Sequence, residues 1–160
     1  LRLGLLQEFS GDYETALTSS RLLLEMNPDF PAAHAFRARI KLIQQNPESA
    51  LKESELETDA FWRRYSKILA LSASDRPGEA NILLEEMIAE DGSHAAYQIA
   101  EILAFQGDLD GAFAWLDRAY QQRVGGMKEL LGNYLLKKLH EDPRWRDLLS
   151  RMQLPLDLDS

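Results

Sequence analysis

The chain has 160 residues, of which 45% are hydrophobic, and it carries a formal net charge of −8 with no cysteine. This hydrophobic fraction excludes a largely disordered chain, and the lack of cysteine excludes disulfides, thiolate metal ligands and thiol nucleophiles. The apolar runs are shorter than the ~18 residues that a membrane-spanning helix needs, and an acidic surface disfavours contacts with nucleic-acid phosphates. We therefore expect a globular cytoplasmic protein that binds neither membranes nor nucleic acids.

A short phrase made of a turn and the first residues of a helix recurs four times along the chain. Each copy closes on an alanine, and these alanines are Ala16, Ala50, Ala80 and Ala112. Their spacing is close to the period of about 34 residues that tetratricopeptide repeats have. A turn followed by a helix that starts with a small residue is also typical of these repeats. The sequence thus predicts an all-α fold, a right-handed α-solenoid of stacked helix pairs.

About four repeats follow from this spacing, and we expect them at residues 1–30, 31–60, 61–92 and 93–122. The first repeat would be truncated, since Leu3 and Gly4 already belong to its first helix. The N-terminus has no signal-peptide pattern, and we interpret it as a cut through a longer chain. The second helix of the second repeat is expected to be weak, because Ser54 and Glu57 stand where apolar residues are usual.

Apolar spacing and proline positions add detail to the later repeats. We expect helices at about 32–45 and 47–57, and a third repeat whose second helix opens at Pro77. In the fourth repeat, the spacing i, i+3, i+4, i+7 of one helical face is met by Ala96, Ile99, Ala100 and Leu103. An acidic cluster ends the second repeat, and we expect a solvated helix end there, formed by Glu53, Glu55, Glu57 and Asp59.

The last part of the chain, residues 123–160, departs from the repeat period at Gly125-Gly126, which we interpret as a hinge. A short helix is expected at 127–131, and a final helix is expected from Pro143, with Asp142 satisfying its free amide donors. Its apolar face consists of Leu148, Leu149 and Met152. We expect this segment to be a helical cap, because a solenoid needs an end repeat that covers its last hydrophobic face.

The runs from Ala112 to Arg123 and from Leu139 to Pro155 resemble the C-terminal end of a group of bacterial signalling proteins. In those families, tetratricopeptide repeats follow a winged-helix transcriptional regulator domain, a class III adenylate cyclase domain or a Ser/Thr kinase domain. Val124 stands where the families have an acidic residue, and Trp145 stands where they have phenylalanine. The resemblance implies an accessory or sensing region of a larger cytoplasmic regulator, without indicating which domain precedes it.

Residues that could carry chemistry are dispersed. The histidines His34, His94 and His140 lie in different parts of the repeat pattern, and none belongs to a His-Glu-x-x-His motif. Gly125-Gly126 lacks the strand and the lysine of a phosphate-binding loop. We therefore predict a protein that is not an enzyme and that needs no metal or cofactor.

A concave groove is the predicted functional surface, because in tetratricopeptide stacks the first helix of each pair lines that side. Alignment of the repeats assigns seven residues to this partner-binding groove, namely Arg39, Trp62, Tyr65, His94, Tyr97, Gln98 and Glu101. Leu5, Glu8 and Phe9 would begin the same surface. Tyrosine and tryptophan are good anchors, since they offer a large contact area with a polar tip. In the alternative, the aromatic residues Phe36, Trp62 and Tyr97 pack between adjacent repeats.

The expected partner is a protein or peptide segment of apolar or mildly basic character. The Lys and Asn clamp with which some repeat domains hold acidic chaperone tails is absent, since the equivalent positions are Leu1, Leu5, Phe36, Trp62 and Ser66. Two alternatives remain open. The chain could act as an intrachain or homodimer scaffold that transmits a signal to or from a missing N-terminal domain, or its groove could sense a small ligand.

Overall fold

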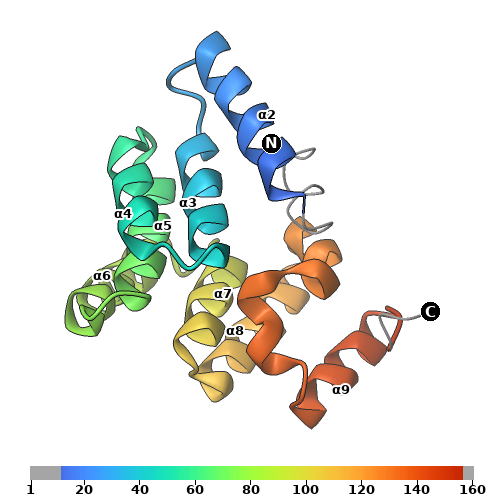
Figure 1. Ribbon diagram of the computed structural model, residues 1–160. Helices are drawn as coiled ribbons and strands as arrows, with labels where there is room; N and C mark the ends of the chain where they lie inside the picture. Colours follow the sequence, from blue (N-terminus) through green and yellow to red (C-terminus); the bar gives the residue numbers. More distant parts are fainter. Residues whose placement is uncertain (1–11, 157–160) are drawn as a thin grey trace. The chain divides into compact units, whose positions relative to one another are not determined.

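The computed structural model describes residues 12–156, which are helical and contain no strand (Figure 1). The predictions made for Leu1, Leu3, Gly4, Leu5, Glu8, Phe9 and Gly11 lie outside the described residues. The described residues form two compact units, which divide between Glu90 and Asp91. Within residues 12–156, no helix is both long and apolar enough to cross a membrane.

The first unit contains five helices within its described part. They are α2 (Tyr13–Met26), α3 (Ala33–Ile43), α4 (Pro47–Leu56), α5 (Ala60–Ser72) and α6 (Pro77–Asp91), the last of which ends one residue into the second unit. Helix α3 packs against α2, α4 and α5, and α4 also packs against α5. An ion pair of 2.7 Å between Arg64 and Glu90 joins α5 to α6. Prolines open α4 and α6 as the sequence predicts, because the first helical position needs no amide donor.

The second unit begins with a helix pair, α7 (Ala96–Gln106) and α8 (Leu109–Gln121), which pack against each other. Gly107 joins them with φ +90°, a backbone conformation that favours glycine. Two 3₁₀ helices follow, η1 (Gly125–Gly132) and η2 (Tyr134–Leu139), and η2 packs against α7. Gly125 and Gly126, which were expected to form a hinge, are instead the first two residues of η1.

The chain ends in α9 (Pro143–Arg151), which starts where the sequence predicts. Asp142 caps this helix, since its carboxylate accepts a hydrogen bond of 3.0 Å from the backbone amide of Arg144. Leu148 and Leu149 are buried, in agreement with the expected apolar face, and Met152 is half-buried.

The four alanines of the recurring phrase hold the same place in four helices. Ala16, Ala50, Ala80 and Ala112 are the fourth residues of α2, α4, α6 and α8, and each is 0% exposed. The backbone amide of each donates to the carbonyl of the residue before its helix, at 3.0, 3.1, 3.3 and 3.0 Å. A methyl side chain is therefore packed on all sides at every copy, and a larger side chain would have to displace its neighbours.

Capping explains why three of these helices begin where they do. The side chains of Asp12, Asn46 and Asp108 accept hydrogen bonds from the backbone amides of Thr15, Ser49 and Gly111, at 3.2, 3.1 and 3.0 Å. Each bond satisfies one of the amides that a helix start leaves without an intrahelical partner. The turn residues of the recurring phrase thus specify the helix starts locally.

Candidate functional site

Three of the seven predicted groove residues lie together in the first unit. Arg39 on α3 donates from Nη1 to the hydroxyl of Tyr65 on α5, at 3.4 Å. The rings of Trp62 and Tyr65 meet edge to face, with centroids 5.5 Å apart. Tyr65 and Arg39 are buried, whereas Trp62 is half-buried. Of these three residues, Trp62 therefore offers the most surface to a partner.

Phe36 on α3 packs against a neighbouring helix, which is the alternative role considered for the aromatic residues. It is buried and belongs to an apolar cluster with Ala16 and Ile40, against which Tyr13 and Leu17 also pack. This cluster joins α2 to α3 and contributes to the core of the first unit.

The other four predicted groove residues lie in the second unit, where Asn133 engages two of them. The amide nitrogen of Asn133, between η1 and η2, donates to the Tyr97 hydroxyl at 2.9 Å and to the Glu101 carboxylate at 2.6 Å. All three side chains are buried. His94 is exposed and lies 3.4 Å from Asp91, and Gln98 is half-buried. The C-terminal segment thus meets the polar side chains of α7.

Sequence reasoning missed Asn133, although its role has a physical basis. Its side-chain oxygen accepts from the backbone amide of Leu135 at 3.0 Å, which caps η2, so that the side-chain nitrogen is left to bind α7. An asparagine before a leucine-rich segment could have indicated such a cap, but nothing in the sequence points to its partners on a helix far back along the chain.

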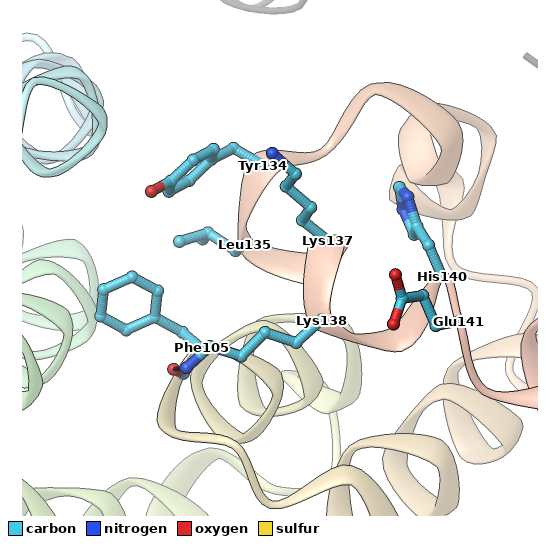
Figure 2. A pocket seen from close by; sticks show the side chains of 7 residues that line it. All are labelled: Phe105, Tyr134, Leu135, Lys137, Lys138, His140 and Glu141. Carbon is cyan, nitrogen blue, oxygen red and sulfur yellow. Dashed lines mark hydrogen bonds between the residues drawn. The ribbon is translucent and has the colours of Figure 1, made fainter.

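A pocket lies in the second unit beside the end of α7 (Figure 2). Its volume is about 550 Å³, and it is lined by Phe105, Tyr134, Leu135, Lys137, Lys138, His140 and Glu141. None of these residues was assigned to a site from the sequence. Six of the seven belong to η2 or directly follow it. A 3₁₀ helix repeats every three residues, and the sequence gives no sign that this short segment adopts that period rather than that of an α-helix.

His140 at this pocket is held in a partly apolar setting. Its ring lies against that of Trp145, with centroids 4.6 Å apart, and its Nε2 atom is buried without a hydrogen-bond partner. Burial lowers the pKa of His140 below its ordinary value of 6.5, and the charge of Lys137 lowers it further. The imidazole is therefore uncharged at neutral pH.

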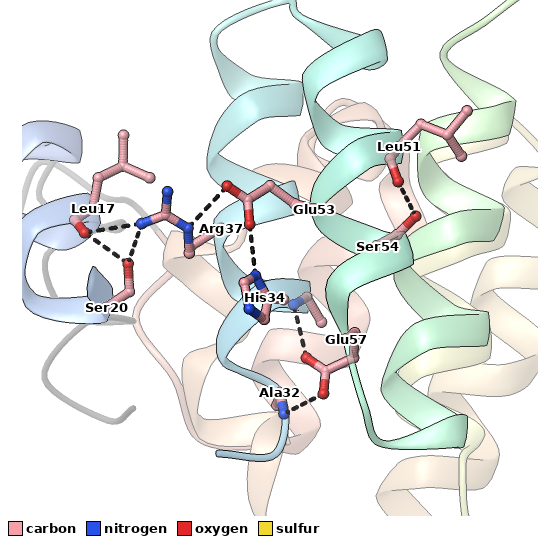
Figure 3. Close-up of polar contacts among 10 residues, drawn as sticks. Leu17, Ser20, Ala32, His34, Arg37, Leu51, Glu53, Ser54 and Glu57 are labelled. Atoms are coloured by element: carbon pink, nitrogen blue, oxygen red, sulfur yellow. Dashed lines mark hydrogen bonds and ion pairs between the residues drawn. The ribbon is translucent and has the colours of Figure 1, made fainter. Parts of the chain in front are cut away.

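A polar network joins α2, α3 and α4 in the first unit (Figure 3). The carboxylate of Glu57 accepts from the backbone amides of Ala32 at 3.3 Å, Ala35 at 3.0 Å and Asp59 at 3.1 Å. Ala32 has φ 67° and provides no side-chain cap for α3. Glu57, which follows α4, therefore caps a different helix through contacts 22 and 25 residues apart in sequence.

Glu53 forms the second half of this network. Its carboxylate accepts from Arg37 Nε at 2.9 Å and lies 2.8 Å from His34 Nδ1. Arg37 Nη1 in turn donates to the Leu17 carbonyl at 3.2 Å and to the Ser20 hydroxyl at 3.3 Å, which connects α3 to α2. These contacts hold three helices together.

The prediction of a solvated helix end is wrong for Glu53 and Glu57. Glu57 is 1% exposed and the Glu53 side chain is 12% exposed, whereas Glu55 is exposed as expected. Glu53 lies on the face of α4 that turns toward α3, and Glu57, whose backbone is extended directly after α4, reaches the start of α3. Ser54 is buried as well, and its hydroxyl is satisfied by the Leu51 carbonyl at 2.6 Å.

Within residues 12–156, no group of three or more His, Asp or Glu side chains is placed to hold a metal ion. The three histidines contact different partners, since His34 lies against Glu53, His94 against Asp91 and His140 against Trp145. Comparison of the chain with protein-family models, with curated proteins and with solved structures gives no match.

Proposed function

We propose that this chain is a scaffold of about four tetratricopeptide-type repeats, arranged as a right-handed solenoid, which binds a segment of another protein. The observation that carries the proposal is the equivalence of the four alanines, each fully buried at the fourth position of its helix. Equivalent buried positions that recur near a period of about 34 residues are the signature of stacked helix pairs.

Helix packing inside each unit supports the same proposal. In the first unit, α3 contacts both α4 and α5, so that one helix meets its pair partner and the first helix of the next pair. In the second unit, α7 and α8 form another pair. Repeat proteins of this kind are stabilised by contacts between neighbouring repeats, and their usual work is to present an extended binding surface.

Trp62 is the anchor that we propose for the partner. It lies on α5 with its indole half-buried and supported edge-on by Phe61 and Tyr65. A tryptophan fixed by its neighbours loses little conformational entropy on binding, which makes it an effective contact. The net charge of −8 favours a partner segment that is apolar or mildly basic. In this proposal the chain is an accessory region of a larger bacterial regulator and catalyses no reaction.

The experiment that tests the proposal compares proteins captured from a lysate of the source organism by three forms of the chain. Wild type and the control Ile82→Ala, which changes an exposed residue of α6, should capture the same protein. Trp62→Ala should lose it, provided that circular dichroism shows an unchanged helix content. Capture that does not depend on Trp62 would contradict the proposed surface.

A further inference from the structure

The pocket beside α7 has the dimensions of a small-molecule site. Its volume of about 550 Å³ falls within the ~300–1,000 Å³ range of ligand pockets. Its walls combine the aromatic ring of Phe105 at the end of α7 with Tyr134 and Leu135 from η2 (Figure 2). These side chains can receive the apolar body of a ligand, and the remaining lining residues are polar.

Two lysines give the pocket its polar character. Lys138 is fixed in place, since its ammonium group donates to the Phe105 carbonyl at 2.6 Å and lies 5.8 Å from the centroid of the Phe105 ring. An ammonium group has three donors, so two remain after this bond. The ammonium group of Lys137 has no hydrogen bond or ion pair with any residue in the described range 12–156.

The lining carries a net charge of one positive unit at neutral pH. Lys137 and Lys138 contribute two positive charges and Glu141 contributes one negative charge, while His140 is uncharged because burial lowers its pKa. This local excess of positive charge stands out in a chain whose net charge is −8. A single negative charge on a ligand would balance this charge.

We infer that this pocket binds a small aromatic monocarboxylate. The carboxylate is held by the ammonium group of Lys137, and the ring lies against Phe105 and Tyr134. The inference goes beyond the proposed scaffold function and does not depend on it, because the pocket residues belong to the second unit and Trp62 lies in the first.

The test is a titration of the full 160-residue chain with 3-phenylpropionate, followed by two-dimensional amide NMR. We expect saturable shifts at Phe105 and at residues 134–141. The neutral analogue 3-phenylpropanamide should bind at least about tenfold more weakly, since a charge-assisted hydrogen bond contributes ~1.5–3 kcal/mol.

Two lysine variants separate a specific site from general attraction to positive charge. Lys137→Met should weaken binding of 3-phenylpropionate about tenfold on the same reasoning. Lys52→Met, which changes an exposed lysine of α4 in the first unit, should leave it unchanged. Both variants replace exposed side chains, so both should keep the wild-type amide spectrum.

Three results would overturn the inference. They are the absence of saturable shifts with 3-phenylpropionate at millimolar concentrations, equal affinity for the carboxylate and its amide, and equal loss of affinity in Lys137→Met and Lys52→Met.

Discussion

Two sets of carboxylates, one in each unit, differ in burial and in the groups that they bind. In the first unit, Glu57 is buried and satisfies three backbone amides, two of which belong to the start of α3. In the second unit, Arg144 bridges Asp110 at 2.7 Å and Asp142 at 2.8 Å, yet its side chain is 46% exposed. The ion pairs of the exposed Arg144 are shorter than the hydrogen bonds of the buried Glu57, which measure 3.0 to 3.3 Å, so distance alone does not rank these contacts.

Burial decides which set matters for stability. Loss of a buried acceptor leaves amide groups without any partner, whereas exposed groups exchange a lost partner for water. We therefore expect the contacts around Glu57 to govern the stability of the first unit, and the ion pairs of Arg144 to contribute little to that of the second. Four changes test this comparison, from the largest expected effect to the smallest.

Glu57→Ala should have the largest effect. It removes the acceptor for the amides of Ala32, Ala35 and Asp59, and we expect a loss of about 3 kcal/mol in the free energy of unfolding. Urea denaturation followed by circular dichroism measures this loss. Glu57→Gln keeps one acceptor oxygen and should lose less. A Glu57→Ala variant as stable as wild type would mean that the amides find other partners.

Ala112→Leu tests the buried alanine positions. Ala112 is 0% exposed, so a leucine there must displace its neighbours, and we expect a loss of about 2 kcal/mol in the free energy of unfolding. Ala114→Leu on the exposed side of the same helix α8 is the matched control and should change stability little. Equal stabilities of the two variants, measured by urea denaturation, would argue against close packing at the recurring alanine.

Glu53→Gln should have an intermediate effect. Glu53 loses its charged contacts to Arg37 and His34 but keeps an oxygen that accepts a hydrogen bond, and we expect a loss of about 1 kcal/mol. Glu55→Gln, two residues away on the exposed side of α4, should change the free energy of unfolding by less than about 0.5 kcal/mol. A lower melting temperature for Glu55→Gln than for Glu53→Gln would contradict this expectation.

Arg144→Ala should have the smallest effect on stability and a clear effect on titration. Hydrogen bonds from the side chain of Arg144 and, to a smaller extent, from its backbone amide lower the pKa of Asp142 from 3.8 to about 2. Because the native pKa is depressed, the stabilisation is present above pH 3.8 and is lost as the pH falls toward 2. Carboxyl-detected NMR should show the pKa of Asp142 rising in Arg144→Ala. An unchanged pKa would assign the shift to the backbone amide of residue 144 instead.

Local signals allowed the helix starts to be predicted from the sequence. Asn46 and Pro47 begin α4 and Asp142 and Pro143 begin α9, because a capping oxygen and a proline act within one turn of helix. The buried alanines could be predicted for a similar reason, since their period appears directly in the chain. The capping signal depends on residues close in sequence, and the alanine signal depends on a phrase that the sequence itself repeats.

Contacts between distant residues could not be predicted in this way. Glu57 was interpreted as part of a solvated end because its partners, the amides of Ala32 and Ala35, lie at the start of another helix, far from it in sequence. Tyr97 and Glu101 were assigned to an open surface, whereas Asn133 binds both of them. The sequence does not show that residues 134–139 form a 3₁₀ helix or that they lie beside Phe105, so the grouping of the pocket residues required the structure.

The most direct test of the proposed function is site-specific photo-crosslinking. The photoreactive residue p-benzoylphenylalanine would replace Trp62, where it keeps an aromatic ring, or Ile82, an exposed position on α6. After irradiation in lysate, mass spectrometry would identify the attached peptide. We expect one recurring apolar or mildly basic segment attached at position 62 and absent at position 82. Equal attachment at both positions, or none at position 62, would contradict the proposal that this face binds a protein segment.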